Sequence, residues 1–221
     1  MKYLSPIYSH RWSPEEMAAV REVWRVLVSD FFQRFVRPEA TIMDLGAGFC
    51  HFINAIKAAR KIAFDANPEI RNHADPEVEV VISNDLTFPQ IRDGELTHVF
   101  MSNFLEHLPS SDEVLNLLSA LKRKLGPDGS LLILQPNFRY TGAAYFDFID
   151  HHVVLTDRSL VEALESTGYR IEYLARRFLP YTSKSRLPKS PALVRLYLKL
   201  PILWKLFGQQ TFVVAVNSRT K

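Results

Sequence analysis

The sequence lacks most of the features that mark secreted, disulfide-stabilised or membrane-spanning proteins. Its 221 residues include a single cysteine, Cys50, which excludes an internal disulfide framework. No apolar run reaches the roughly 18 residues needed to cross a bilayer, and the N-terminus has no basic-then-apolar secretory pattern. We therefore expect a cytoplasmic protein in which Cys50 is a small structural residue rather than a nucleophile.

Acidic residues are missing from the last quarter of the chain. Glu172 is the last acidic residue, and ten Lys and Arg residues follow it. The net charge of +3 thus conceals an acidic body joined to a basic C-terminal segment. Such an asymmetry favours an anionic partner surface.

One segment carries most of the functional information. Residues 41–45 are short, apolar and β-prone, Gly46 and Gly48 then predict a turn, and residues 49–59 have helical periodicity. The next β-prone run ends in Asp65. A strand, a glycine turn, a helix, a strand and an acid form the layout of a nucleoside-binding βαβ unit, in which the acid lies near the ribose hydroxyls.

Two residues distinguish this segment from the dinucleotide-binding fingerprint. That fingerprint needs a third glycine for close packing of helix on strand, and here His51 occupies the position. Asp44 would also bring a carboxylate toward the place of a pyrophosphate, where like charge is unfavourable. A carboxylate there suits a cationic ligand better. A nicotinamide-dependent oxidoreductase remains an alternative.

The run Asp44-Leu-Gly46-Ala47-Gly48 resembles the first motif of class I S-adenosylmethionine-dependent methyltransferases. The resemblance implies that Asp44 and the glycine turn hold the methionine part of S-adenosylmethionine, and that Asp65 with Ala66 holds the ribose. Asn84-Asp85-Leu86, after the β-prone run 78–82, is similar to the family's third motif. There the acid and the following backbone amide would read the adenine. The cofactor residues implied in these motifs are Asp44, Gly46, Ala47, Gly48, Asp65, Ala66, Asn84, Asp85 and Leu86.

A fourth β-prone run, 97–101, leads into Ser102-Asn103 and Glu106-His107-Leu, which resembles the stretch after the family's fourth strand. Ligands in open α/β sheets bind outside the carboxyl ends of the strands. Ser102, Asn103 and His107 are therefore expected beside the cofactor's methionine part. His107 could also remove a hydroxyl proton, because its unperturbed pKa is near 6.5. The alternative is that Glu106 and His107 tie a loop to the first turn of a helix.

Aromatic residues crowd beside Asp150, His151 and His152 further along the chain, which suggests an acceptor pocket with flat walls and a few polar anchors. Either histidine could be the base instead of His107, and an aromatic mini-core under a loop is the alternative. We expect no metal site, because no second spaced set of ligands accompanies the two histidines. The candidate acceptor contacts are Asn137, Tyr140, Tyr145 and Phe148.

Alternation of strands and helices predicts an α/β fold with a mostly parallel sheet covered on both faces. The family resemblance implies a Rossmann-like, seven-stranded sheet whose last strand is antiparallel. We expect one domain over residues 1–221, with an N-terminal helical cap at 1–37. Between the last two strands we expect an inserted basic lid at 178–208. Strands are expected near 41–45, 61–65, 78–82, 97–101, 130–135, 169–176 and 211–217, and helices near 13–35, 49–59, 112–124 and from 156.

These observations predict an S-adenosylmethionine-dependent methyltransferase that O-methylates a small-molecule, sugar or lipid-linked acceptor. The leucine-rich basic segment 184–208 could also contact an anionic membrane from the cytoplasmic side. Nucleic acid is a less suitable partner, since the aromatic residues of this segment are interleaved with leucines. A non-catalytic protein that keeps the cofactor fold for binding is the other alternative.

Overall fold

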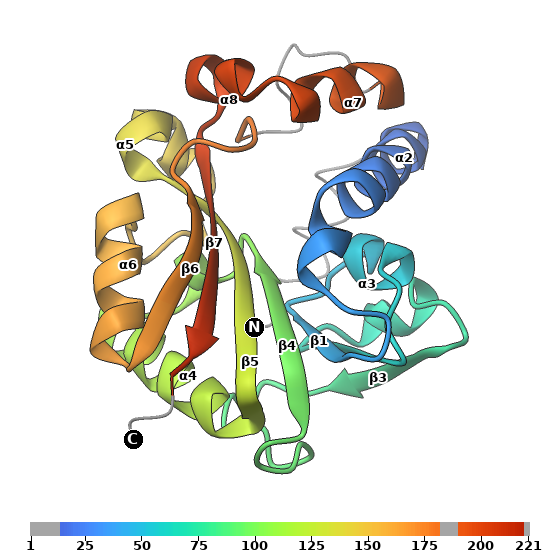
Figure 1. Ribbon diagram of the computed structural model, residues 1–221, viewed down its shortest axis with the longest axis vertical. Helices are drawn as coiled ribbons and strands as arrows, with labels where there is room; N and C mark the ends of the chain where they lie inside the picture. The colour runs from blue at the N-terminus through green and yellow to red at the C-terminus, as the bar shows by residue number, and fades with distance from the viewer. Residues whose placement is uncertain (1–13, 182–189, 219–221) are drawn as a thin grey trace.

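The computed structural model describes residues 14–181 and 190–218. Its centre is a seven-stranded sheet with strand order β3-β2-β1-β4-β5-β7-β6. The first five strands of this order run parallel, and β7 lies antiparallel between β5 and β6. This confirms the predicted fold class, including the antiparallel last strand (Figure 1).

The strands lie close to their predicted positions. They are β1 (Thr41–Leu45), β2 (Arg60–Asp65), β3 (Val78–Ile82), β4 (Leu96–Ser102), β5 (Leu125–Pro136), β6 (Tyr169–Ala175) and β7 (Gln210–Asn217). The helices are α2 (Pro14–Asp30), α3 (His51–Ala55), α4 (Ser111–Lys124), α5 (Phe138–Thr141), α6 (Asp157–Ser166), α7 (Pro191–Lys199) and α8 (Pro201–Phe207). Short 3₁₀ helices are η1 (Phe32–Phe35), η2 (Pro68–Asn72), η3 (Leu105–His107) and η4 (Gly142–Asp147).

Two predicted boundaries were wrong. The helix expected over 49–59 is only α3, because Cys50 before it has φ 56° and Ile56 after it is extended. Gln33 holds the chain in this extended path, since its side chain pairs with both the backbone N–H and the carbonyl of Lys57 at 2.8 and 3.0 Å. The strand expected near 130–135 is longer at its start, because β5 begins at Leu125 and its pairing with β4 shifts register between Leu96 and His98.

The sheet separates two apolar cores. Strand residues alternate between them, so that Ile42 and Phe100 pack on one side while Met43 and Val99 pack on the other. Helices α2, α3 and α7 contribute to the first core, and α4 and α6 to the second. This period of two is the expected pattern for a sheet covered on both faces. Asp44 lies two residues after Ile42 on β1, so its carboxylate points to the same face of the sheet, the side of α3.

Helices α7 and α8 lie over the carboxyl end of the parallel strands, beside α2 (Figure 1). An aromatic cluster holds them there, because the Phe31 ring stacks on Phe178 at 4.2 Å and meets Trp204 edge-on at 5.7 Å. Arg195 of α7 also pairs with Asp30 of α2 at 3.4 Å. Over 14–181 and 190–218, no helix is both long and apolar enough to span a membrane.

Candidate functional site

The predicted functional residues gather at the carboxyl edge of the sheet. Strand β1 is bordered by β2 on one side and β4 on the other, so the chain order reverses at this strand. Ligands of open α/β sheets bind at such a reversal. The loops that follow β1, β2, β4 and β5 therefore form the candidate site.

The loop after β1 is a tight turn that requires glycine. Gly46 has φ +73°, and a Cβ added to it would lie 2.4 Å from Cδ2 of Phe104. Gly48 has φ +50° but more space, since the nearest atom to its Cβ position is 4.0 Å away. The turn is fixed to β2, because the Gly46 N–H donates to the Phe64 carbonyl at 2.8 Å. The glycines thus leave the backbone open to a ligand and admit the Phe104 ring.

Asp65 organises the mouth of this turn. Its carboxylate accepts hydrogen bonds from the backbone N–H of Gly48 at 2.9 Å and from that of Asn67 at 2.8 Å. It therefore links the loop after β1 to the loop after β2. Ala66, the next residue, is exposed.

Asp44 lies deeper than Asp65, with 3% of its surface exposed. Burial, and then the negative charge of Asp65, raise its pKa to about 8, and a hydrogen bond from the Ile53 backbone opposes the rise. Two carboxylates at one strand edge make this a site for a cation. The donor set fits S-adenosylmethionine, whose sulfonium and ammonium groups are cationic, and fits a pyrophosphate poorly.

The third predicted cofactor element, after β3, lies at the surface. Asn84 and Asp85 are exposed and Leu86 is half-buried. Asp85 accepts hydrogen bonds from the Thr87 hydroxyl at 2.6 Å and from the Thr87 N–H at 2.9 Å, and these bonds lower its pKa. The Asp85 carboxylate is thus held ionised in a turn at the site's edge.

Ser102 and Asn103 continue the edge at the end of β4. Asn103 has φ +50°, a conformation that asparagine tolerates better than most residues. Its backbone N–H donates to the Leu134 carbonyl of β5 at 2.9 Å, and its side-chain amide donates to the Ser102 hydroxyl at 3.3 Å. The bend turns the chain into η3 and positions Glu106 and His107.

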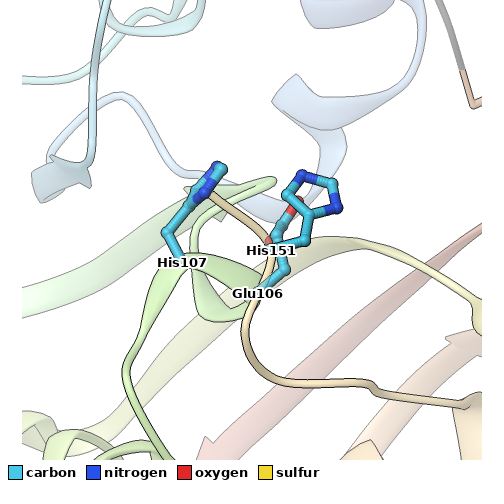
Figure 2. A group of neighbouring side chains, drawn as sticks. All are labelled: Glu106, His107 and His151. Carbon is cyan, nitrogen blue, oxygen red and sulfur yellow. The ribbon is translucent and has the colours of Figure 1, made fainter. Parts of the chain in front are cut away.

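Glu106, His107 and His151 form a compact cluster between the loop after β4 and the loop before α6 (Figure 2). The two histidine rings lie 5.1 Å apart. The His107 Nδ1–H donates to the Asp150 carbonyl at 2.9 Å, and an Asp150 carboxylate oxygen lies 3.5 Å from the same nitrogen. The backbone also ties the two segments together, since the His152 N–H donates to the Glu106 carbonyl at 2.8 Å.

Glu106 is fully buried. Burial raises the pKa of its carboxyl group, although His107, a backbone hydrogen bond and Gln135 oppose the rise. One carboxylate oxygen, Oε2, accepts from the Gln135 amide at 3.0 Å. The other, Oε1, has no hydrogen-bond partner in the part of the chain that the structure describes.

The residues predicted as acceptor contacts divide into two groups. The Phe148 ring stacks on His151 at 5.1 Å, and Tyr145 meets the same ring edge-on at 4.8 Å. Tyr145 is buried and its hydroxyl donates to the Val153 carbonyl, so it supports the cluster from beneath. Tyr181, which the sequence analysis did not single out, lies 3.5 Å from the Nδ1 of His151 through its hydroxyl.

The other two predicted contacts lie away from the histidines. Asn137 is buried and its amide donates to Asp157 at 3.1 Å and to Thr211 at 2.9 Å, so it joins β5, β7 and α6. Tyr140 lines a separate cavity of about 480 Å³ with Arg139, Asp157 and residues of α6. The structure thus does not bring these two side chains to the cluster.

Two residues near the site, Cys50 and His51, have a structural character. Burial raises the pKa of the Cys50 thiol to about 12, which leaves it un-ionised and unsuited to act as a nucleophile. His51, at the third-glycine position, has a pKa lowered by burial to about 4. His152 is exposed, unlike its neighbour His151.

Sequence reasoning missed Glu106, Gln135 and Tyr181 as parts of the site. Glu106 had a signal, because it is a charged residue next to Leu105 and directly before His107. Gln135 and Tyr181 had none, because only the fold brings them to the histidines.

Comparisons with known proteins agree with this geometry. A family model described as a methyltransferase domain matches residues 18–174. Among solved structures, an S-adenosylmethionine-dependent methyltransferase of Archaeoglobus fulgidus is 19% identical, with a TM-score of 0.65 over 89% of this chain and 94% of its own. A search of curated proteins found no match.

Two other solved structures show the same fold with different descriptions. One is a methyltransferase in complex with the Trm112 methyltransferase activator of Haloferax volcanii, 15% identical, with a TM-score of 0.66 over 93% of this chain and 94% of its own. The other, from Thermotoga maritima, is described as a possible histamine N-methyltransferase and is 13% identical, with a TM-score of 0.66 over 97% of this chain and 96% of its own. Such identities relate folds and leave the acceptor open.

The family model spans most of the chain, from α2 to β6, and it includes the glycine turn, both buried carboxylates of β1 and η3, and the histidine cluster. The chain therefore belongs to the methyltransferase domain family, as a class I enzyme for which S-adenosylmethionine is the expected cofactor.

Proposed function

We propose that the protein transfers the methyl group of S-adenosylmethionine to a hydroxyl oxygen of a small-molecule, sugar or lipid-linked acceptor. The observation that carries this proposal is the histidine cluster on the acceptor side of the glycine turn. A hydroxyl must lose a proton during methylation, whereas a neutral amine can attack with its own lone pair. Histidines oriented beside a carboxylate are suited to that task.

The cofactor half of the site would use Asp44 and the glycine turn for the methionine part, Asp65 for the ribose and Asp85 for the adenine. Support comes from the backbone N–H bonds that orient the Asp65 carboxylate. It also comes from the negative charge of Asp65, which acts on Asp44 and helps to raise its pKa. When bound, S-adenosylmethionine supplies an already activated methyl group. The protein's residues then have to align the acceptor and exclude water.

On the acceptor half, His107 is the best-placed base. The carbonyl of Asp150 can only accept a hydrogen bond, so the proton of a neutral His107 ring is on Nδ1. The lone pair is then on Nε2, which can receive the hydroxyl proton. The nearby carboxylate of Asp150 would stabilise the imidazolium that forms, as the acid of a catalytic triad does.

Calorimetry and a transfer assay test this proposal. The purified protein should bind S-adenosylmethionine and S-adenosylhomocysteine and should not bind NAD. With labelled S-adenosylmethionine, it should methylate members of a panel of hydroxyl compounds and leave the matched compounds with blocked hydroxyls unlabelled. Labelling of amines alone would overturn O-methylation, and tight binding of NAD without S-adenosylhomocysteine would overturn the cofactor assignment.

The surface of α7 and α8 supports a lipid-linked acceptor. Leu198 is buried and Trp204 packs on Phe178 at 4.9 Å, so one side of this segment packs on the rest of the domain, which suits a lid. The other side exposes large apolar side chains together with Lys199 and Lys205. An apolar face with basic residues suits the boundary of an anionic membrane. The exposed apolar residues are Leu193, Leu196, Leu200, Ile202, Leu206 and Phe207.

Co-sedimentation with vesicles separates a membrane contact from a lid alone. Wild type should bind anionic vesicles better than neutral ones at low salt. Changing both Lys199 and Lys205 to Gln should weaken this binding by roughly 30-fold, since each basic residue contributes about 1 kcal/mol. The control changes Arg123 and Arg158 to Gln, because both are exposed on the opposite helices α4 and α6. If wild type ignores both vesicle types, or both double variants lose binding equally, the segment is a lid alone.

A further inference from the structure

The cluster of Glu106, His107 and His151 has the composition of a metal site. One ligand atom from each of these residues can be chosen so that all three lie within 4.8 Å of one another. The ligands come from two segments, η3 and the loop before α6 (Figure 2). Two imidazoles with one carboxylate form a ligand set used by catalytic zinc sites and by non-haem iron sites, both of which keep positions open for a substrate.

Hydrogen bonds to the backbone orient both imidazole rings. The Nδ1 of His107 faces the Asp150 carbonyl at 2.9 Å, and the Nδ1 of His151 faces the Tyr145 carbonyl at 2.8 Å. A carbonyl accepts and never donates, so each neutral ring carries its proton on Nδ1 and its lone pair on Nε2. Metal-binding histidines commonly have this arrangement, in which a backbone carbonyl holds the nitrogen that does not bind the metal.

Glu106 gives an independent indication of a ligand. Its side chain is fully buried, and Oε2 accepts a hydrogen bond from Gln135 while Oε1 has no partner among the described residues. Leaving a buried carboxylate oxygen unpaired is costly, and each such group in a native structure needs an explanation. A cation bound between this oxygen and the histidines would remove the deficit. The Gln135 amide would then orient the carboxylate from behind.

We propose that Glu106, His107 and His151 bind a divalent transition-metal ion of the zinc class, and that the acceptor hydroxyl takes an open position on this ion. Zinc, rather than magnesium or calcium, is the expected type because nitrogen supplies two of the three ligands. The sequence predicted no metal, because no second spaced set of ligands accompanies His151 and His152. The role of the ion in the reaction rests on the proposed function, whereas the binding of the ion does not.

Binding requires a modest contraction of the cluster. Ligands at about 2.0–2.1 Å from a tetrahedral ion lie about 3.3 Å from one another, compared with the 4.8 Å limit that holds here. His107 has 26% of its side chain exposed and His151 is half-buried, so both rings can move. Glu106, enclosed in the core, is the fixed point toward which they would close.

The ion would take over the activation of the hydroxyl from the histidines. Both imidazoles become ligands, and a coordinated hydroxyl has a lowered pKa. Its proton passes to water while the electron pair of the O–H bond stays on oxygen. That pair forms the new bond to the methyl carbon, and the electrons of the broken carbon–sulfur bond remain on sulfur. In the absence of the ion, His107 serves as the base described above.

Binding of the metal alone provides the test. The full-length protein, freed of metal with a chelator, is titrated with Zn²⁺ by calorimetry and with Co²⁺ by visible absorption, which reports the nitrogen and oxygen ligands. We expect one equivalent of either ion. His107→Ala and His151→Ala should weaken binding by at least roughly 100-fold, because each removes a direct ligand and loss of a mere outer-shell partner already costs about 10–100-fold. His152→Ala, which changes an exposed neighbour, should bind as wild type.

Three results would overturn the metal site. These are no binding at millimolar ion, a stoichiometry that His107→Ala and His151→Ala leave unchanged, and a Co²⁺ spectrum that is lost equally in His152→Ala. Circular dichroism of each variant excludes a folding defect as the cause of lost binding. Binding of S-adenosylhomocysteine is measured on the same samples. If it persists while Zn²⁺ does not bind, the metal site fails and the proposed function stands; the reverse result leaves the metal site and removes the function.

Discussion

The two halves of the proposed site are built in different ways. The cofactor half joins Asp44, Gly46 and Asp65, which lie on one βαβ unit and are connected by hydrogen bonds within it. The acceptor half joins Glu106 to His151 across the structure, and the loop before α6 reaches it through backbone bonds from His152 and Val153. The first half is therefore a local motif and the second a product of tertiary folding.

Their electrostatics differ as well. The cofactor half has a negative potential, because the charge of Asp65 helps burial to raise the pKa of the Asp44 carboxyl group to about 8. The acceptor half surrounds one buried carboxylate, Glu106, with imidazoles. A cationic ligand suits the first half, and proton transfer or metal coordination suits the second. Substitutions should separate the two halves by affecting binding of the cofactor or turnover, but not both.

The largest effect should come from the acceptor half. His107→Ala should lower turnover by roughly 10²–10⁴ while the affinity for S-adenosylmethionine stays near wild type, because it removes the group that activates the hydroxyl. The measurement is methyl transfer to a hydroxyl acceptor, with calorimetry of cofactor binding in parallel. His73→Ala, a histidine that contacts Phe49 away from the cluster, is the matched control.

Full turnover in His107→Ala, His151→Ala and His152→Ala together would contradict this assignment. Alignment of acceptor and methyl group would then suffice by itself. A fall in cofactor affinity in His107→Ala would instead show that the two halves are not separable.

The second effect concerns the glycine turn. Gly46→Ala should reduce the free energy of unfolding by about 2–4 kcal/mol, because a left-handed backbone costs an alanine about 1–2 kcal/mol and the added Cβ would also lie 2.4 Å from Phe104. Gly48→Ala carries the first cost without the second, since its nearest neighbour is 4.0 Å away. Chemical denaturation of both variants measures the difference. Equal losses would mean that Phe104 moves aside freely.

The sequence predicted the strands and the glycine turn better than it predicted how the histidine cluster is assembled. Alternating apolar residues and glycine positions located the strands and the turn, because these features depend on neighbours in the chain. The short α3 was mispredicted, since Gln33 holds Lys57 from outside the segment. The sequence could not place the side chains of Asn137 and Tyr140. Their directions depend on contacts with β7 and α6, which come later in the chain. The unpaired oxygen of Glu106 also depends on tertiary burial.

A third effect sharpens the cofactor half. Asp65→Ala should weaken binding of S-adenosylhomocysteine by about 10–150-fold, equivalent to about 1.5–3 kcal/mol for hydrogen bonds to a charged acceptor. Asp85→Ala should have a smaller effect, because its carboxylate is exposed and already accepts two bonds from Thr87. Calorimetry gives both affinities. An equal or larger loss in Asp85→Ala would reverse the assignment of ribose and adenine contacts.

The last effect, and the one of opposite sign, concerns Asp44. Its pKa in the folded protein is raised to about 8 from the ordinary value of 3.8, so the folded state holds a proton that the unfolded state has released. Between these values the free energy of unfolding of wild type must fall as pH rises. Asn cannot titrate and can still accept the Ile53 hydrogen bond. Asp44→Asn should therefore match wild type near pH 4 and exceed it progressively toward pH 8.

Even one unit of the pKa difference is worth about 1.4 kcal/mol. Thermal denaturation at pH 5 and pH 8 can therefore detect the difference in stability between wild type and Asp44→Asn. The stabilised variant should nevertheless bind S-adenosylmethionine more weakly, because the cation loses its buried counter-charge. Wild type should also release a proton on binding, seen as a dependence of the calorimetric heat on the ionisation enthalpy of the buffer, and Asp44→Asn should not. A variant that is neither more stable at pH 8 nor weaker in binding would show that Asp44 is an ordinary core residue. A gain in stability accompanied by a loss in affinity would mark Asp44 as a residue retained for the cofactor at the expense of the fold.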